Sequence, residues 1–189
     1  FLTAETVIQI ALPDLHVTWL CVTLLSVLYF TYCSEMWNQL DALTGLLNQN
    51  SYLNRTAEMS RSGGLLIVFD VDNFKQVNDC YGHLQGDACL AAIAACLKKA
   101  YACCGYCYRI GGDEFCVLLK NTAKEAACAE EFLRQLEKKR RELTFLPTVS
   151  CGSAPLSGED VVAVKDQADR AMYHHKKARK ERAAAIVPE

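Results

Sequence analysis

The chain has 189 residues, of which 51% are hydrophobic and 22% charged, and its formal net charge is −2. This length corresponds to one average domain with some residues to spare, so the chain can bury a core without disulfide or metal staples. The composition excludes disordered, collagen-like and mucin-like chains. The near-neutral charge argues against a nucleic-acid polymer as partner, because such binding needs a strongly basic surface.

The first forty residues carry very little charge. Between Asp14 and Glu35 lie twenty residues without Asp, Glu, Lys or Arg, and twenty residues of helix rise about 30 Å, the thickness of a bilayer core. Aromatic residues stand near both ends of this run, as is typical of membrane interfaces. We therefore expect residues 1–40 to contain a transmembrane helix and a connector, the end of a truncated membrane sensor region that anchors the chain in the cell membrane. The run is diluted by Thr18, Thr23, Ser26 and Thr31, which leaves a buried core helix or a coiled-coil linker as the alternative.

Eleven cysteines are present, an odd number, and several fall within predicted helices. This pattern favours reduced, buried thiols in a cytosolic domain over a disulfide framework. Cys104 and Cys107 have the spacing of a zinc or redox pair, but the chain offers no second pair or nearby His to complete such a site.

From residue 41 onward the pattern is that of a compact domain with strands and helices in alternation. The first strand ends in acidic residues, and two later strands flank a glycine turn, as in a hairpin. The order β, α, β-turn-β, α, β predicts an α+β fold of ferredoxin-like type, an antiparallel sheet with flanking helices. The predicted strands are 65–69, 106–110, 115–119 and 147–154, and the predicted helices are 86–102, 123–141 and 159–178.

The hairpin turn carries two glycines and two acids. Gly111 and Gly112 allow close approach of another molecule to the backbone, and Asp113 and Glu114 place carboxylates at the tip. In the split βαβ topology the end of the first strand, residues 70–72, meets this turn at one edge of the sheet. Clustered carboxylates with backbone carbonyls are the ligands that Mg²⁺ requires.

Five segments in order resemble the GGDEF-domain diguanylate cyclase family, whose catalytic domain has a nucleotidyl-cyclase, palm-like fold. The resemblance runs from about residue 41 to residue 180 and implies a cyclase domain at 41–182 followed by a tail at 183–189. The segments are DALTGLLN at 41–48, FDVDNFKQVNDCYGHLQGD at 69–87, RIGGDEF at 109–115, TVSCGSA at 148–154 and ADRAMYHHKK at 168–177.

The resemblance implies an enzyme that condenses two GTP molecules into cyclic di-GMP with release of pyrophosphate, working as a homodimer in which each domain binds one GTP. Two Mg²⁺ ions per active site, with Mn²⁺ as an alternative, would neutralise the triphosphate and activate the attacking 3′-hydroxyl. By resemblance, Asp70, the Val71 carbonyl and Asp113 are metal ligands. Glu114 is either a further metal ligand or the group that accepts the hydroxyl proton. Asp70, Asp113 and Glu114 are thus the predicted catalytic residues.

The resemblance also implies how the triphosphate is held. The main chain after the first strand would cradle the terminal phosphates, and two lysines at i and i+4 on one face of the last helix would reach them. The alternative for these lysines is a solvated helix end that complements the helix dipole or touches anionic lipid. Lys180 stands where the family usually has Arg. A lysine lacks the bidentate geometry of the guanidinium, so the phosphate-binding role is less strongly implied for Lys180 than for Lys176. The residues implied are Asn73, Phe74, Lys75, Gly111, Gly112, Lys176 and Lys180.

Base recognition would fall to Asn78 and Asp87. A carboxylate can accept from guanine N1–H and the exocyclic amine at once, whereas adenine offers no such donor pair, so Asp87 favours GTP over ATP. Asp87 could also be the N-cap of the helix that follows it.

Two rival functions stay open from the sequence. One is a catalytically silent GTP-binding module that regulates a partner, and the other is a cyclase with a mixed or adenine-containing product. Ala102 and Gly105 stand where the family has the R-x-x-D of its product-inhibition site, so we expect no feedback inhibition there. The catalytic domain is expected in the cytosol, where GTP is found.

Overall fold

The computed structural model describes residues 4, 6–7, 10, 17–37, 39–158 and 160–186; within these, only the backbone is described at 17–18, 35–37 and 179–186. The chain divides into two compact units, Phe1–Gln39 and Leu40–Glu189. Each unit is considered by itself below.

The first unit contains one long helix, α2 (Val17–Trp37). Its large apolar side chains from Trp19 to Tyr32 are exposed, and the Thr23 hydroxyl donates to the Trp19 carbonyl of its own helix at 2.7 Å. In the part of the chain that the structure describes, no helix combines the length and the apolar character needed to cross a membrane. The predicted helix is confirmed, whereas the predicted membrane span is not found among the described residues.

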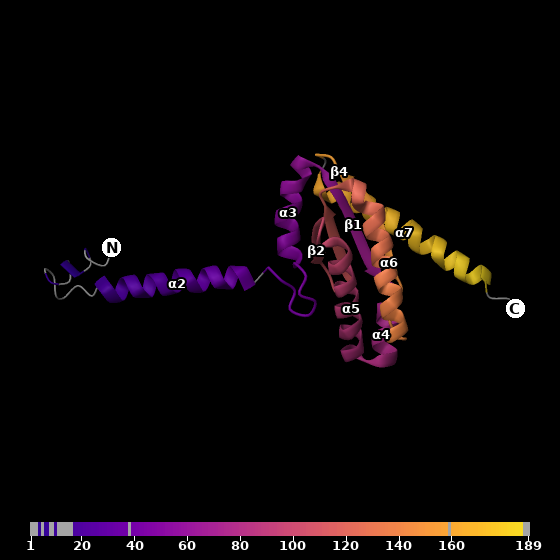
Figure 1. Ribbon diagram of the computed structural model, residues 1–189, viewed down its shortest axis with the longest axis horizontal. Coiled ribbons are helices and arrows are strands. Elements are labelled where there is room, and N and C mark those ends of the chain that lie inside the picture. The colour runs from indigo at the N-terminus through magenta and orange to yellow at the C-terminus, as the bar shows by residue number, and fades with distance from the viewer. Residues whose placement is uncertain are drawn as a thin grey trace. The chain divides into compact units, whose positions relative to one another are not determined.

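The second unit is an α+β domain in which helices lie on both faces of a four-stranded sheet (Figure 1). Its elements in chain order are α3 (Gln49–Ser62), β1 (Gly64–Val71), α4 (Phe74–Tyr81), α5 (His83–Tyr101), β2 (Gly105–Arg109), β3 (Glu114–Leu119), the short 3₁₀ helix η1 (Thr122–Lys124), α6 (Glu125–Glu142), β4 (Val149–Leu156) and α7 (Val161–Ile186).

The strands lie in the order β2-β3-β1-β4, and every neighbouring pair is antiparallel. This is the strand order of the split βαβ arrangement, so the predicted α+β fold with an antiparallel sheet is confirmed. The two halves of the hairpin, β2 and β3, are joined by residues 110–113, and β1 lies directly beside β3. The end of β1 therefore reaches the hairpin turn.

β1 reads as a continuous apolar run because both of its faces are buried. Ile67 and Phe69 belong to a core shared with α5 and α6, whereas Leu66 and Val68 belong to a second core shared with α3 and α7. On the first face, Phe69 packs edge-on against Phe132 of α6, with ring centroids 5.3 Å apart. The central strand is thus fixed from both sides, which makes its last residues a rigid base for a site.

Two helical boundaries differ from the predicted ones. Helix α4 was not anticipated, and α5 begins at His83 instead of residue 86 because Gly82, at φ 84°, ends α4 and caps α5. Asp87 therefore lies inside α5, so the N-cap alternative for it is wrong. At the other end, α7 continues to Ile186 and includes the beginning of the predicted tail.

Gly152 of β4 sets the position of α7. A Cβ atom at this residue would lie 2.2 Å from the Met172 amide nitrogen and 2.3 Å from the Ala168 carbonyl oxygen. Only a glycine lets the backbones of strand and helix come this close. The contact fixes the helix that carries Lys176 one turn further on.

Candidate active site

The end of β1 and the glycine turn meet, as the topology predicted. Asp70 is paired in register with Glu114 across the β1–β3 ladder, and the Val71 amide donates to the Asp113 carbonyl oxygen at 3.3 Å. Acids that are more than forty positions apart in the sequence thus lie at one edge of the sheet.

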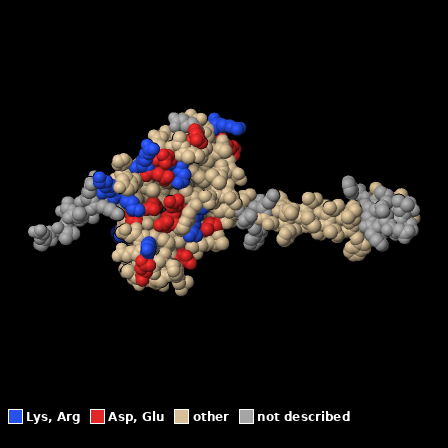
Figure 2. Space-filling view, turned by 180° about the vertical axis from the view of Figure 1, so that it is seen from behind, with Lys and Arg blue, Asp and Glu red and all other residues tan. Residues whose placement is uncertain are grey.

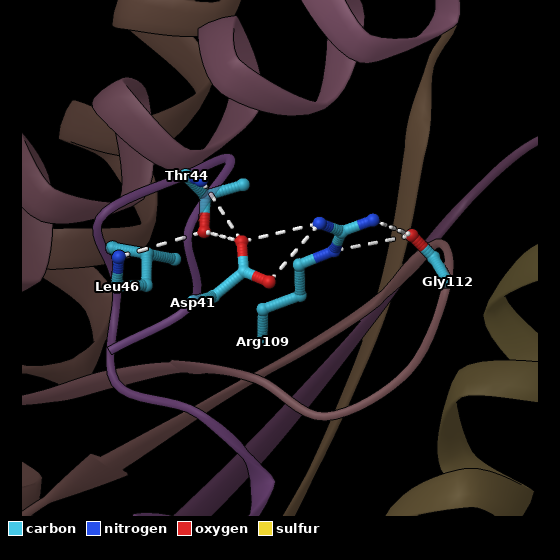
Figure 3. A network of polar contacts seen from close by, with 5 residues as sticks. All are labelled: Asp41, Thr44, Leu46, Arg109 and Gly112. Atoms are coloured by element: carbon cyan, nitrogen blue, oxygen red, sulfur yellow. Dashed lines mark hydrogen bonds and ion pairs between the residues drawn. The ribbon is translucent and has the colours of Figure 1, made fainter. Parts of the chain in front are cut away.

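A guanidinium holds the glycine turn in place (Figure 3). Arg109 donates from Nη1 to both carboxylate oxygens of Asp41, at 3.1 and 3.2 Å, and from Nη2 and Nε to the Gly112 carbonyl oxygen, at 2.8 and 3.3 Å. The Thr44 amide and hydroxyl donate to Asp41 Oδ1 at 2.9 and 2.6 Å. Arg109 and Asp41 were not predicted as site residues, although both fall in the motifs at 109–115 and 41–48.

The electrostatics of Asp41 agree with this role. Partial burial favours a raised pKa, but the hydrogen bonds from Thr44 and the Arg109 guanidinium outweigh it and hold the pKa of Asp41 below its ordinary value of 3.8. Asp41 is therefore ionised at neutral pH and orients the guanidinium for the turn.

Lys176 of α7 reaches the acids at the end of β1. Its ammonium is ion-paired with Asp70 and lies 3.7 Å from Asp72 Oδ1. Partial burial lowers the pKa of Lys176, but the hydrogen bond to Asp70 and the charges of Asp70, Asp72 and Asp113 raise it above its ordinary value. The structure thus brings Lys176 to the predicted site, whereas the side chain of Lys180 lies outside the described residues.

Asp72 was missed as a site residue. Its carboxylate is buried and accepts hydrogen bonds from the hydroxyls of Thr148 and Ser150, both at 2.8 Å, and its amide donates to the Thr148 carbonyl. The residue fastens the end of β1 to β4 and faces Lys176. The only hint in the sequence is the D-x-D spacing at the end of a buried strand.

Cation binding at this edge is favoured by the donor set. Asp70 and Asp113 supply carboxylates and Val71 a backbone carbonyl, all hard oxygen ligands, and Asp70 is already paired with the Lys176 ammonium. Across the described ranges, no group of three or more His, Cys, Asp and Glu side chains has the arrangement of a metal site.

The turn between β1 and α4 has an unusual backbone. Asn73 adopts the left-handed conformation, with φ 55° and ψ 32°, which costs energy for a residue other than glycine and is found at functional sites. Its carbonyl accepts from the Gln76 amide at 2.9 Å, while the first amides of a helix, here those of Phe74 and Lys75, have no partner within the helix. The exposed Lys75 side chain lies on the same turn.

The predicted base-recognition residues lie on two adjacent helices. Asn78 Oδ1 is buried and accepts no hydrogen bond from the described residues. It lies against Gly86, where a Cβ atom would come within 2.0 Å of it. Asp87, the next residue of α5, has an exposed side chain. A buried acceptor without a donor beside an exposed carboxylate fits a ligand that brings N–H groups.

Glu114 does not belong to the Lys176 cluster. It is exposed and lies near Lys165 of α7, which is ion-paired with Asp169 at 3.0 Å. Partial burial lowers the pKa of Lys165, but the hydrogen bond and charge of Asp169, together with the charge of Glu114, raise it above its ordinary value. A Cβ atom at Gly111 would lie 3.3 Å from Glu114 Oε2, so the glycine leaves room for this side chain. Both roles considered for Glu114 stay open.

The charge on the surface is mixed. On the face seen in Figure 2, acidic and basic side chains alternate over the second unit, and no continuous basic patch covers that face. The mixture suits a small anionic ligand held by individual lysines.

Comparison with known proteins agrees with these observations. The family model for the diguanylate cyclase GGDEF domain matches residues 38–182. The chain is 38% identical over 160 residues to diguanylate cyclase DgcP of Pseudomonas aeruginosa, which is 75% of this chain and 23% of DgcP. It is 34% identical over 165 residues to cyclic di-GMP phosphodiesterase PdeR of Escherichia coli, 79% of this chain and 24% of PdeR. The chain thus spans about a quarter of the length of these relatives.

Solved structures share the fold. The coiled coil and GGDEF domain of DgcB from Caulobacter crescentus, solved in complex with c-di-GMP, matches with a TM-score of 0.71 and 25% identity over 85% of this chain and 94% of that one. The DgcB GGDEF domain alone matches with a TM-score of 0.64 and 28% identity over 74% of this chain and 91% of that one. Because the family model spans most of the chain and the fold agrees with solved members, the chain belongs to the GGDEF diguanylate cyclase family.

Proposed function

We propose that the second unit is a diguanylate cyclase that converts two GTP molecules into cyclic di-GMP and two pyrophosphates. In each half-reaction the 3′-oxygen of one GTP attacks the α-phosphorus of the other, and the bond to the β-phosphate breaks. The observation that carries the proposal is the meeting of Asp70, Asp113 and Lys176 at one edge of the sheet.

Asp70, Asp113 and the Val71 carbonyl would hold Mg²⁺, with Glu114 as a further ligand or the proton acceptor. When bound, the ion would neutralise the triphosphate and lower the pKa of the attacking hydroxyl. Lys176 supports this role because it already neutralises Asp70. On substrate binding, its ammonium would pass to a phosphate oxygen and leave Asp70 to the metal.

The remaining contacts to the nucleotide would come from the turn between β1 and α4 and from the glycine turn. The amides of Phe74 and Lys75 and the Lys75 ammonium would bind the terminal phosphates, aided by the left-handed backbone at Asn73. Gly111 and Gly112 would let the nucleotide approach the turn, with Lys180 adding charge from the end of α7.

The choice of guanine is supported by the α4–α5 pair. Guanine would donate its N1–H and exocyclic amine to Asp87 and the orphaned Asn78 Oδ1. Adenine carries an acceptor at N1, so it would leave these acceptors unpaired. Incubation with GTP and ATP together should therefore yield the guanine-only product, and a mixed dinucleotide would contradict this assignment.

Each domain would bind one GTP, so two copies must face each other around a two-fold axis to close the ring. We infer an active homodimer in the cytosol, where GTP is found.

Purified protein, assayed with GTP and Mg²⁺, should release pyrophosphate and cyclic di-GMP, identified by mass spectrometry. Asp113→Ala should abolish the product while keeping the fold. The matched control is Asp166→Ala, which removes an exposed carboxylate paired with Arg170 on α7 and should leave the rate unchanged. Product from Asp113→Ala at the wild-type rate would overturn the proposal.

A silent GTP-binding module is the second candidate, because PdeR, 34% identical to this chain over 165 residues, is named as a phosphodiesterase and not as a cyclase. It predicts GTP binding without product at any protein concentration. A rate per protein that rises with protein concentration, as domain pairing requires, would exclude it.

A further inference from the structure

Three cysteines form a cluster away from the acidic site. Cys104, just before β2, has its sulfur 3.0 Å from the sulfur of Cys128 on α6 and 3.6 Å from that of Cys103. All three are thiols without a disulfide, and the cluster passes from exposed Cys103 through half-buried Cys104 to buried Cys128. Cys107, which has the C-x-x-C spacing with Cys104, instead donates its thiol to the Leu97 carbonyl at 3.7 Å.

We propose that these thiols are a site of oxidative modification, at which a small-molecule disulfide converts Cys104 and Cys128 into a disulfide by way of Cys103. A disulfide bond is about 2.05 Å long, so the two sulfurs need to approach by about 1 Å. The cluster is independent of GTP binding, and the proposal does not rest on the cyclase activity.

Exposure decides where the oxidant enters. Burial, aided by the neighbouring sulfurs of Cys128 and Cys103, raises the pKa of the Cys104 thiol to about 12, so at neutral pH little of it is the reactive thiolate. Cys103 is open to solvent and meets the oxidant first. Its sulfur is already in contact with Cys104, which makes the following transfer intramolecular.

The reaction balances as three thiol–disulfide exchanges. The Cys103 thiolate attacks one sulfur of the disulfide RSSR, the RS–SR bond breaks, and RS⁻ leaves. Cys104 then attacks the Cys103 sulfur and expels the second RS⁻. Finally Cys128 attacks the Cys104 sulfur and restores the Cys103 thiolate. Two electrons and two protons pass from Cys104 and Cys128 to RSSR, which ends as two RSH.

The product would tie the turn between α5 and β2 to α6 and close a loop of about 25 residues in the unfolded chain. Such a cross-link should raise the thermal unfolding midpoint of the whole chain by about 5–10 °C, since it restricts the unfolded ensemble. Dithiothreitol should reverse the shift.

Tryptic mapping tests the proposal directly, with glutathione disulfide as the probe on native full-length chain. Cys103 and Cys104 fall in the peptide 100–109, and Cys128 falls in the peptide 125–134. We expect the two peptides to appear linked, with a mass two hydrogens below their sum. Native wild-type protein in which these peptides never link would overturn the proposal.

Variants separate the roles. Cys103→Ser should slow the link at least about tenfold, because Cys104 is half-buried and its raised pKa leaves little thiolate to attack the oxidant. Cys80→Ser, which removes another exposed thiol, on α4, should leave the rate unchanged. Cys107→Ala should still form the link, and Cys104→Ala should not. Equal slowing by Cys103→Ser and Cys80→Ser would refute the entry role of Cys103.

Discussion

Replacing Arg109 by lysine tests whether the guanidinium clamp positions the glycine turn. The guanidinium contacts Asp41 and the Gly112 carbonyl at once, with two hydrogen bonds to each. A lysine ammonium is a point charge and cannot span both partners. We expect Arg109→Lys to keep the ion pair with Asp41 and to lose the hold on Gly112.

The magnitude follows from the lost contact. A hydrogen bond involving a charged group contributes about 1.5–3 kcal/mol net. The two bonds to Gly112 share one acceptor oxygen and are exposed, so together we count them as one such bond, which stabilises the held position of the turn by about 2 kcal/mol. At 1.36 kcal/mol per factor of ten, the fraction of molecules whose glycine turn keeps the position seen in the structure falls up to about 30-fold. The rate of cyclic di-GMP formation should fall with it. The core is untouched, so the unfolding midpoint should change little.

Two measurements check this reasoning. The rate of cyclic di-GMP formation reports the site, and amide hydrogen exchange at residues 110–114 reports the turn whether or not the protein is active. Arg134→Lys is the matched control, because Arg134 pairs with Glu131 on the exposed surface of α6 and should affect neither. Unchanged exchange at the turn in Arg109→Lys would refute the clamp.

Three further changes test the supporting structure. Asp72→Asn should lower the free energy of unfolding in urea by about 1–3 kcal/mol, because the two hydroxyls of Thr148 and Ser150 donate to different carboxylate oxygens and the amide NH2 that replaces one of them cannot accept. It also removes the negative charge beside Lys176; wild-type stability would contradict this. Gly152→Ala should cost about 3 kcal/mol, since its methyl group meets the backbone of α7, whereas Gly112→Ala, in open space, should cost below about 0.5 kcal/mol. Because the pKa of Asp41 is lowered in the folded chain, its stabilisation is present above pH 4 and is lost as the pH falls through the folded-state pKa. The stability gap between wild type and Asp41→Asn should therefore narrow below pH 4, and a gap that widens there would reverse the assignment.

The fold followed from local patterns. The apolar run of β1, the glycine turn and the helical periodicity of α5 are signals carried by neighbouring residues, and they predicted the α+β sheet and its strand order. The boundary between α4 and α5 was not predicted. Gly82 ends the first helix and caps the second, and the spacing of apolar residues does not show where one helix stops and the next begins. For α2, the run of uncharged residues predicted the helix but not its surroundings.

The site likewise has a part that the sequence predicts and a part that it does not. Its acids could be predicted from the sequence, because a strand end and a hairpin tip are brought together by topology alone. The partners of these acids could not: Arg109 reaches Asp41 across 68 positions and Lys176 reaches Asp70 across 106. The pairing of Cys104 with Cys128 depends likewise on how α6 packs beside the α5–β2 turn. Residue types and spacing determined which groups carry the chemistry, whereas the packing of helices on the sheet, set by close contacts such as that at Gly152, decided which of them meet.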